Sequence, residues 1–207
     1  ALVLRQNGHN KILARCSMSM IRDTDYFSVA VSTLNGEITV NTHELTIFKF
    51  YDTTFLRGKI GIGVKDDAAY FDDIIVCEKD EPDCDVTYDF NNKSINGWTP
   101  WERDNWSTSL KDYSVVLYLT STSHTAPSAN RLGEVITIDN INAENFTFEC
   151  DLKSIEWTTN PTADLGLVFC YIDDENYYTV IFRRDTGETE FVRIQNNQEK
   201  TLDQYSG

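Results

Sequence analysis

ADLGLVFCYIDDENYYTVIFRR, residues 163–184, decides the fold class of this chain. Two runs rich in β-branched and aromatic residues, Leu165–Ile172 and Tyr177–Arg184, flank four polar residues, Asp173, Asp174, Glu175 and Asn176. Runs of this composition predict strands of a buried sheet, and consecutive polar residues between them predict a tight reversal. The stretch therefore predicts a β-hairpin.

The rest of the chain carries the same kind of signal. Asn-Gly pairs at Asn7-Gly8 and Asn35-Gly36 predict hairpins over residues 2–14 and over Tyr26–Ser32 with Glu37–Asn41, because both turn residues tolerate positive φ. Further strands are predicted at Thr46–Phe50, Lys59–Val64, Tyr70–Val76, Glu134–Ile138, Asn145–Leu152 and Glu188–Gln195. No stretch has the period of an amphipathic helix, so we expect an all-β protein.

Length and charge limit the classes of partner. The chain has 207 residues, enough for one large sandwich or two small domains, and a formal net charge of −15. That charge argues against binding to nucleic acid or to anionic membranes, which would repel it. No apolar run approaches the roughly 20 residues that span a bilayer, so membrane insertion is not expected.

Several motifs resemble a known family. Gly166–Tyr178 has the form G-L-V-F-x-Y-x-D-x-x-N-Y-Y, which is similar to the middle of concanavalin A-like (laminin G-like) jelly-roll modules. Gly58–Val76 resembles the end of such a module, and Asp89-Phe90 followed by Asn96-Gly97-Trp98 resembles the beginning of one. The resemblance implies a two-sheet antiparallel β-sandwich.

The motif that resembles the end of a module precedes the motif that resembles the beginning of one. Residues 1–76 resemble the closing half of one module, 77–85 read as a charged linker, and 86–207 resemble the opening half of the next. Leu2–Ala14 also aligns without gaps on Phe191–Asp203, with five identities in thirteen positions and an offset of 189 residues. We expect a neighbouring chain or adjoining sequence to complete each half. The alternative is one circularly permuted sandwich, in which one of the two similar hairpins is left over.

Five cysteines and three sequons bear on the compartment. In a hairpin centred near Asn160, Cys150 and Cys170 face each other on the inward side, which predicts a disulfide; the alternative is two buried thiols. Cys77 and Cys84 bracket the linker and are a second candidate pair, whereas Cys16 has no evident partner. Asn92, Asn105 and Asn145 begin Asn-x-Ser/Thr sequons. Together these features predict an extracellular glycoprotein.

Catalytic patterns are missing from the sequence. Glycoside hydrolases of the laminarinase type share the resembled fold and place acids as Glu-x-Asp-x-x-Glu or Glu-x-Asp-x-Glu along one strand, which aims them into one cleft. Glu188 and Glu190 have no third acid on their face, so we expect them to face solvent. The three histidines lie far apart, with no nucleophile beside them. We expect no enzymatic activity.

Two binding sites remain candidates. Asp66 with Asp67, and Asp173 with Asp174, supply carboxylates of the kind that calcium prefers, although Asp is also an ordinary turn residue. Trp157 lies in a predicted loop and is a candidate platform for stacking on a sugar. No cofactor is certain, and calcium is the one to test.

These features lead to two functional hypotheses. The first is a structural or adhesive module of an extracellular glycoprotein that associates with copies of itself or with adjoining repeats into an array or filament. The second is a carbohydrate-binding lectin module, with or without calcium. The resemblance implies both roles and selects neither.

Overall fold

The computed structural model describes residues 2–6, 9–14, 26–42, 45–78, 86–111, 114–120, 131–155 and 163–206. Almost all of these residues lie in strands or in the turns between them. The elements are β1 Leu2–Gln6, β2 His9–Ala14, β3 Phe27–Leu34, β4 Glu37–Thr42, β5 Leu45–Tyr51, β6 Lys59–Lys65, β7 Ala69–Glu78, β8 Val86–Tyr88, β9 Trp98–Pro100, the 3-10 turn η1 Arg103–Asn105, β10 Trp106–Lys111, β11 Ser114–Leu119, β12 Glu134–Ile138, β13 Phe146–Ser154, β14 Asp164–Asp173, β15 Asn176–Arg183, β16 Glu188–Gln195 and β17 Gln198–Ser206.

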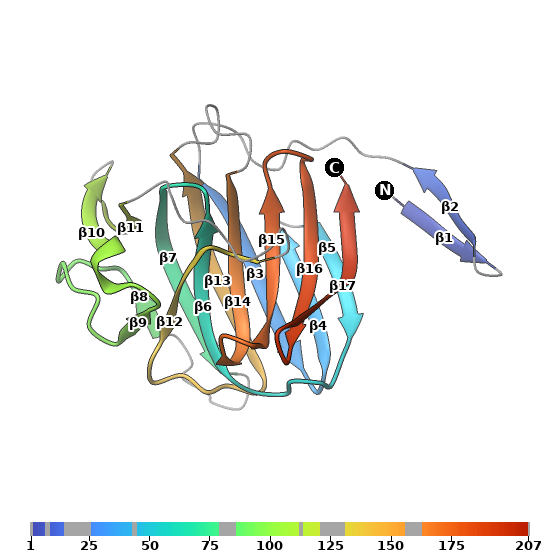
Figure 1. Ribbon diagram of the computed structural model, residues 1–207, viewed down its shortest axis with the longest axis horizontal. Coiled ribbons are helices and arrows are strands. Elements are labelled where there is room, and N and C mark those ends of the chain that lie inside the picture. Colours follow the sequence, from blue (N-terminus) through green and yellow to red (C-terminus); the bar gives the residue numbers. More distant parts are fainter. Residues whose placement is uncertain are drawn as a thin grey trace.

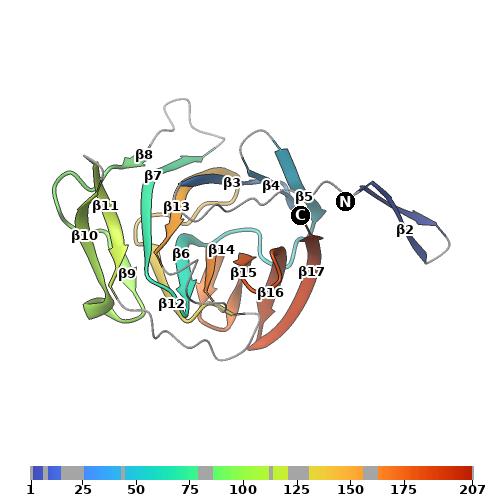
Figure 2. The ribbon, with the colours of Figure 1, turned by 90° about the horizontal axis from the view of Figure 1, so that it is seen from above.

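Two large antiparallel sheets pack face to face as a sandwich (Figures 1 and 2). One has eight strands in the order β10-β11-β7-β13-β3-β4-β5, with β8 paired to β7. The other has seven in the order β17-β16-β15-β14-β6-β12-β9, and among the described strands β1 and β2 pair only with each other. The prediction of a two-sheet antiparallel β-sandwich is confirmed.

Both sheets contain strands from the two predicted halves. In the larger sheet β7 hydrogen-bonds to β13 and to β11, and in the smaller sheet β6 hydrogen-bonds to β14 and to β12. Residues of 27–76 and of 90–191 share one apolar core. The chain thus follows the alternative of one closed sandwich, and not the leading expectation of two halves that are completed from outside.

Alternating side chains build that core. Along β13, Phe146, Phe148, Cys150 and Leu152 are fully buried, and the residues between them are half-buried or exposed. This is the period-two pattern of a strand with one inward face. Burial of large aromatic and aliphatic side chains from both sheets supplies the main driving force for the sandwich.

The outward face of the seven-stranded sheet is buried as well. Val168, Ile181, Val192 and Ile194 are fully buried there in a second apolar cluster, together with Leu132, Val135 and Tyr177. Leu132 lies over Gly166: a Cβ placed on this glycine would stand 2.9 Å from Leu132 Cδ1 and 2.7 Å from the carbonyl oxygen of Val180. β14 is therefore buried on both faces, which explains its nearly continuous apolar sequence.

Most predicted strands agree with the structure. β12 and β16 have the predicted bounds, and the Asn35-Gly36 turn has positive φ at both residues, 51° and 83°. The short strands β8 and β9 and the β10–β11 hairpin were not predicted. The predicted linker begins too early, because Cys77 and Glu78 belong to β7, and residues 79–85 lie outside the described chain.

The predicted disulfide between Cys150 and Cys170 is wrong. β13 pairs with β3 and β7, whereas β14 pairs with β15 and β6 in the other sheet, so the two strands do not form a hairpin. Both residues are buried free thiols, which was the alternative. Cys77 is half-buried on β7, but Cys84 and Cys16 lie outside the described residues, so the pairing of Cys77 with Cys84 stays a prediction.

Candidate functional site

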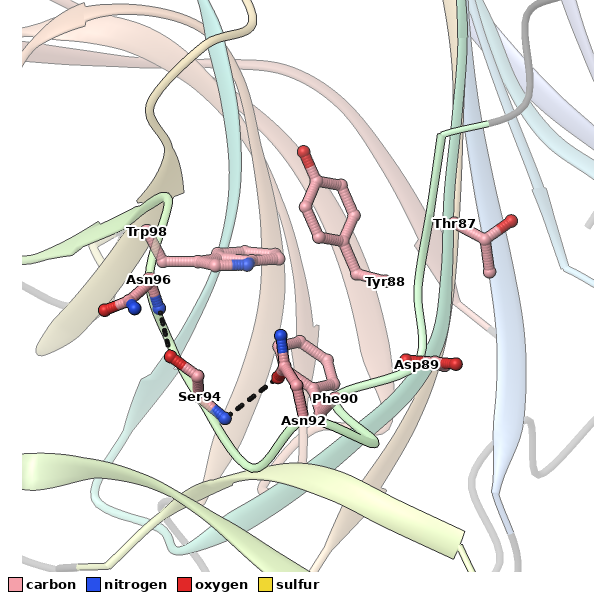
Figure 3. Close-up of a pocket in the computed structure, with 8 residues that line it drawn as sticks. All are labelled: Thr87, Tyr88, Asp89, Phe90, Asn92, Ser94, Asn96 and Trp98. Carbon is pink, nitrogen blue, oxygen red and sulfur yellow. Dashed lines mark hydrogen bonds between the residues drawn. The ribbon is translucent and has the colours of Figure 1, made fainter.

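A hollow of about 110 Å³ opens between β8 and β9, where the chain leaves one strand of the larger sheet and enters the smaller one. Its lining is drawn in Figure 3 and consists of Thr87, Tyr88, Asp89, Phe90, Asn92, Ser94, Asn96 and Trp98. All of these residues belong to the described part of the chain. The hollow is thus the first candidate site.

Short polar side chains shape the loop that forms one wall. Asn91 N donates to Asp89 Oδ1 at 3.1 Å, Ser94 N to Asn92 Oδ1 at 3.0 Å, and Asn96 N to Ser94 Oγ at 3.1 Å. Asp, Asn and Ser favour such turns because their side chains replace a backbone acceptor two residues away. The polar sequence Asp89–Asn96 therefore fixes its own winding path.

Aromatic rings form the floor and the other wall. The Trp98 ring meets Tyr88 edge to face at 5.1 Å between centroids and lies 5.7 Å from the Phe90 ring. Trp98 is only 6% exposed and belongs to the core, as its place in the family motif implies. The upper part of the hollow is polar and its base is apolar, an arrangement suited to orienting a small polar ligand.

Charge in the hollow comes from one carboxylate. Hydrogen bonds from the backbone and side chain of Asn91 hold the pKa of Asp89 below its ordinary value. Burial, together with the nearby charge of Asp139, raises the pKa of Tyr88. Asp89 is ionised and Tyr88 neutral at pH 7, so the hollow can accept and donate hydrogen bonds. It lacks the second acid that glycoside hydrolysis requires.

The remaining tryptophans lie elsewhere. Trp101 is half-buried on the outer side of the seven-stranded sheet, where its Nε1 donates to Tyr171 Oη at 3.3 Å. Trp106 is buried, and its Nε1 donates to Glu134 Oε1 at 3.0 Å. Trp157, the predicted sugar platform, lies outside the described residues. Its role stays a prediction.

The two predicted calcium turns are far apart. Asp66 and Asp67 follow β6 at the end of the sandwich where Lys65 faces Asp164, whereas Asp173 and Asp174 follow the opposite end of β14. Asp173 Oδ1 accepts hydrogen bonds from Glu175 N and Asn176 Nδ2, which is the ordinary role of Asp in a turn. Within the described chain, no three acidic, His or Cys side chains are grouped as metal ligands. The two turns cannot form one joint site.

The three sequons differ in accessibility. Asn92 is exposed at the lip of the hollow. Asn105 is half-buried, and its Nδ2, the atom that would carry the sugar, donates to Glu102 Oε2 at 3.1 Å. Asn145 is also half-buried and accepts a hydrogen bond from Asn35 N. Asn92 is the best placed for glycosylation.

The edge of the seven-stranded sheet is a second candidate site. β16 and β17 form its last hairpin, which we call the edge hairpin, and β1 with β2 form the amino-terminal hairpin. Both reverse through two residues, and both contain a bulge at the same place. Leu2 pairs with Ala14 and Val3 with Ile12, as Phe191 pairs with Asp203 and Val192 with Thr201. The offset of 189 residues seen in the sequence therefore holds for the backbone register too.

An anchor of the edge hairpin was not predicted. Arg193 on β16 donates from Nη1 to Asp52 Oδ2 at 2.7 Å, in the connection between β5 and β6. Tyr178 Oη donates to the other oxygen of Asp52 at 2.7 Å and accepts from Phe55 N. Asp52 is 126 positions from Tyr178 and 141 positions from Arg193 in sequence. No local pattern could have revealed the contact.

A row of charges on the outward face of the smaller sheet was also missed. Asp164 accepts hydrogen bonds from Lys65 Nζ and Arg183 Nη1, each at 3.3 Å, and Arg183 Nη2 donates to Glu190 Oε2 at 2.6 Å. Glu190 is therefore paired and its side chain is only 13% exposed, so the expectation that it faces solvent is wrong. Burial raises the pKa of Asp164, although Lys65 and Arg183 oppose the rise.

Comparison with known proteins adds no identity. No known protein family matches the chain, and no curated protein sequence matches it. Among the described residues, no helix has the length and apolar character needed to cross a membrane. The features of the described structure that bear on function are the hollow, the edge hairpin and the amino-terminal hairpin.

Proposed function

We propose that this chain is a structural or adhesive module of an extracellular glycoprotein, and that it associates with copies of itself or with adjoining repeats. The observation that carries the proposal is the repeated hairpin. The amino-terminal hairpin is similar in sequence to the edge hairpin and has the same pairing register and bulge, yet among the described strands it pairs with neither large sheet. The edge hairpin already forms one edge of the seven-stranded sheet. The amino-terminal hairpin is therefore available to pair with a second module.

Extracellular location is supported by the exposed sequon at Asn92. An acidic surface suits a secreted protein that must stay dissolved, since a net charge of −15 opposes nonspecific aggregation. We further infer a concanavalin A-like jelly roll whose strand order is circularly permuted within this chain. The support for that identity is the set of motifs around Gly166–Tyr178 and Asp89–Trp98 together with the sandwich.

Sedimentation velocity tests self-association directly. The whole chain, secreted from eukaryotic cells, is expected to show a sedimentation coefficient that rises between ~1 μM and ~500 μM, a range that covers the weak affinity of a small interface. Mass spectrometry of the same material is expected to find a glycan on Asn92. A single monomeric species across the whole range would contradict the proposal.

The hollow favours a second candidate function, a lectin module. Amide, hydroxyl and carboxylate groups above an aromatic floor can hydrogen-bond to a sugar while its apolar face contacts the rings. On a glycan array, unglycosylated protein is expected to bind a defined set of sugars and to lose that binding in Asn96→Ala. Gln198→Ala, an exposed change on β17, serves as the control, and Trp157→Ala tests the platform predicted from the sequence. Equal sugar binding by all variants would show that neither Asn96 nor Trp157 contacts the sugar.

A further inference from the structure

The amino-terminal hairpin fits the place of the edge hairpin in backbone but not in side chains. Aligned by the offset of 189, Arg5 takes the position of Ile194 and Leu4 that of Arg193. Ile194 is fully buried opposite Tyr177, so a guanidinium there would be desolvated. Leu4 would leave the carboxylate of Asp52 without its cation. The amino-terminal hairpin therefore cannot replace the edge hairpin in a copy of this chain.

The amino-terminal hairpin can instead extend the seven-stranded sheet beyond β17. β17 is the last strand in the order of the smaller sheet. Asn196 and Asn197 both have positive φ, 49° and 62°, as in a type I′ turn, so Gln195 and Gln198 form a hydrogen-bonded pair. Because bonded and nonbonded pairs alternate, the N–H of Thr201 points away from β16 toward the open side. Among the described strands none hydrogen-bonds to β17 on that side, so β17 can accept another strand there.

Charge favours a copy of the same chain as the occupant. Residues 1–14 contain Arg5 and Lys11 and no acidic residue, in a chain whose net charge is −15. The edge hairpin instead carries four acids, but Glu190 pairs with Arg183 and Glu199 pairs with Arg131. The attraction therefore rests on the exposed carboxylate of Asp203 and on the net charge of the body. The amino-terminal hairpin is thus a basic element attached to an acidic body, and a second acidic body attracts it.

We propose, resting on the self-association proposed above, that the amino-terminal hairpin of one copy adds to the open edge of β17 in a second copy and extends the seven-stranded sheet between chains. Main-chain hydrogen bonds supply the contact, as in other cases of strand addition. Donor and acceptor surfaces differ, so the contact is heterologous. Copies joined in this way form an open chain rather than a closed dimer.

Two pairs of variants test the donor and the acceptor by sedimentation velocity. Arg5→Glu with Lys11→Glu reverses the charge of the hairpin, and Arg5→Lys with Lys11→Arg preserves it. Thr201→Pro removes the outward N–H from β17, and Thr201→Ala keeps it. We expect the first member of each pair to weaken association about tenfold or more, and the second to match the wild type. Circular dichroism checks that every variant keeps its strand content and melting temperature.

Mixing gives the sharper test. The charge-reversed variant still offers its β17 edge, and Thr201→Pro still offers its hairpin, so an equimolar mixture is expected to form a 1:1 dimer and nothing larger. If the wild type associates and the charge-reversed variant associates equally well, this surface is wrong while the proposed function stands. If the wild type stays monomeric, both fail. If Thr201→Pro does not fold, the hairpin pair alone decides.

Discussion

Replacing Arg193 by Leu gives β16 the residue that its counterpart β1 carries, Leu4. In the wild type the guanidinium contacts Asp52 and Thr54, and the side chains of Arg193 and Asp52 are only 17% and 10% exposed. The variant leaves an ionised carboxylate in a largely buried place. It still accepts hydrogen bonds from Tyr178 Oη and Thr54 N, so part of its charge stays compensated.

We expect the free energy of unfolding to fall by about 3 kcal/mol, near the lower end of the range for breaking a buried ion pair. For a chain of 207 residues this lowers Tm by roughly 6–12 °C. Urea unfolding followed by tryptophan fluorescence measures the change. Lys49→Leu is the matched control: its partner Glu37 lies 3.0 Å away but both side chains are largely exposed, so we expect a change below about 0.5 kcal/mol.

A double-mutant cycle and the pH dependence of unfolding test whether the Arg193–Asp52 ion pair causes this loss of stability. Burial alone raises the pKa of Asp52, but hydrogen bonds from Thr54 and Tyr178 and the charge of Arg193 together hold it below its ordinary value. The stabilisation is therefore complete above the unfolded pKa near 3.9 and is lost as pH falls through the lower folded pKa. The difference between Arg193→Leu and wild type should shrink over that acidic window. Additive effects of Arg193→Leu and Asp52→Asn at pH 7 would refute the ion pair as the cause.

Three further predictions follow from described contacts. Burial raises the pKa of Cys150, and that of Cys170 to about 12; iodoacetamide at pH 8 should therefore label both only after unfolding, and peptide mass spectrometry showing them linked would contradict the free thiols. Gly166→Ala should cost about 1–3 kcal/mol in urea unfolding, because its Cβ would lie 2.7 Å from the Val180 carbonyl oxygen; a rescue by Leu132→Ala would show that this backbone clash is not the cause. Asn92→Gln should remove more glycan from secreted protein than Asn105→Gln, because the Nδ2 of Asn105 donates to Glu102; the reverse order on a gel would be inconsistent with this assignment.

Local sequence was sufficient to predict the β3–β4 hairpin around Asn35-Gly36 and the β14–β15 hairpin. Turn residues such as Asn35 and Gly36 specify positive φ, and alternation from Phe146 to Leu152 specifies one buried face, so strands and turns follow from neighbours in the chain. The short strands β8 and β9 lack that alternation. Their position depends on Trp98 packing against Tyr88 and Phe90, a contact that composition alone does not indicate.

Sheet partners could not be read locally, and the cysteine error shows why. β13 and β14 are neighbours in sequence with a loop between them, which is the usual setting of a hairpin. The chain instead crosses from one sheet to the other, and β7 and β3 flank β13. Pairing between sheets is decided by core packing across the whole chain, so the opposed placement of Cys150 and Cys170 followed from a wrong neighbour.

The charged contacts around the edge hairpin were equally hidden. Asp52, Arg193 and Tyr178 each look like ordinary strand or turn residues, and Glu190 looks like an outward residue on an alternating strand. Only the sheet order brings Glu190 beside Arg183 and brings Asp52 beneath Arg193. The sequence did show that the two hairpins are similar at an offset of 189 residues, because each similarity lies within one local pattern.

The burial of the smaller sheet constrains where this protein can interact. Its inward face packs in the core, and on its outward face Val168, Ile181, Val192 and Ile194 are fully buried. A ligand cannot reach these positions without displacing apolar packing. A partner can reach the smaller sheet at its rim, at the hollow beside β9 and along the edge of β17. An edge presents main-chain groups that pair with another strand almost regardless of its sequence, so specificity must come from charge and shape. The amino-terminal hairpin has the bulge of the edge hairpin and a basic charge, so it fits the proposed extension of the sheet in another copy. It carries Leu4 and Arg5 where the edge hairpin has Arg193 and Ile194, and the buried position of Ile194 keeps it from replacing the strands already there.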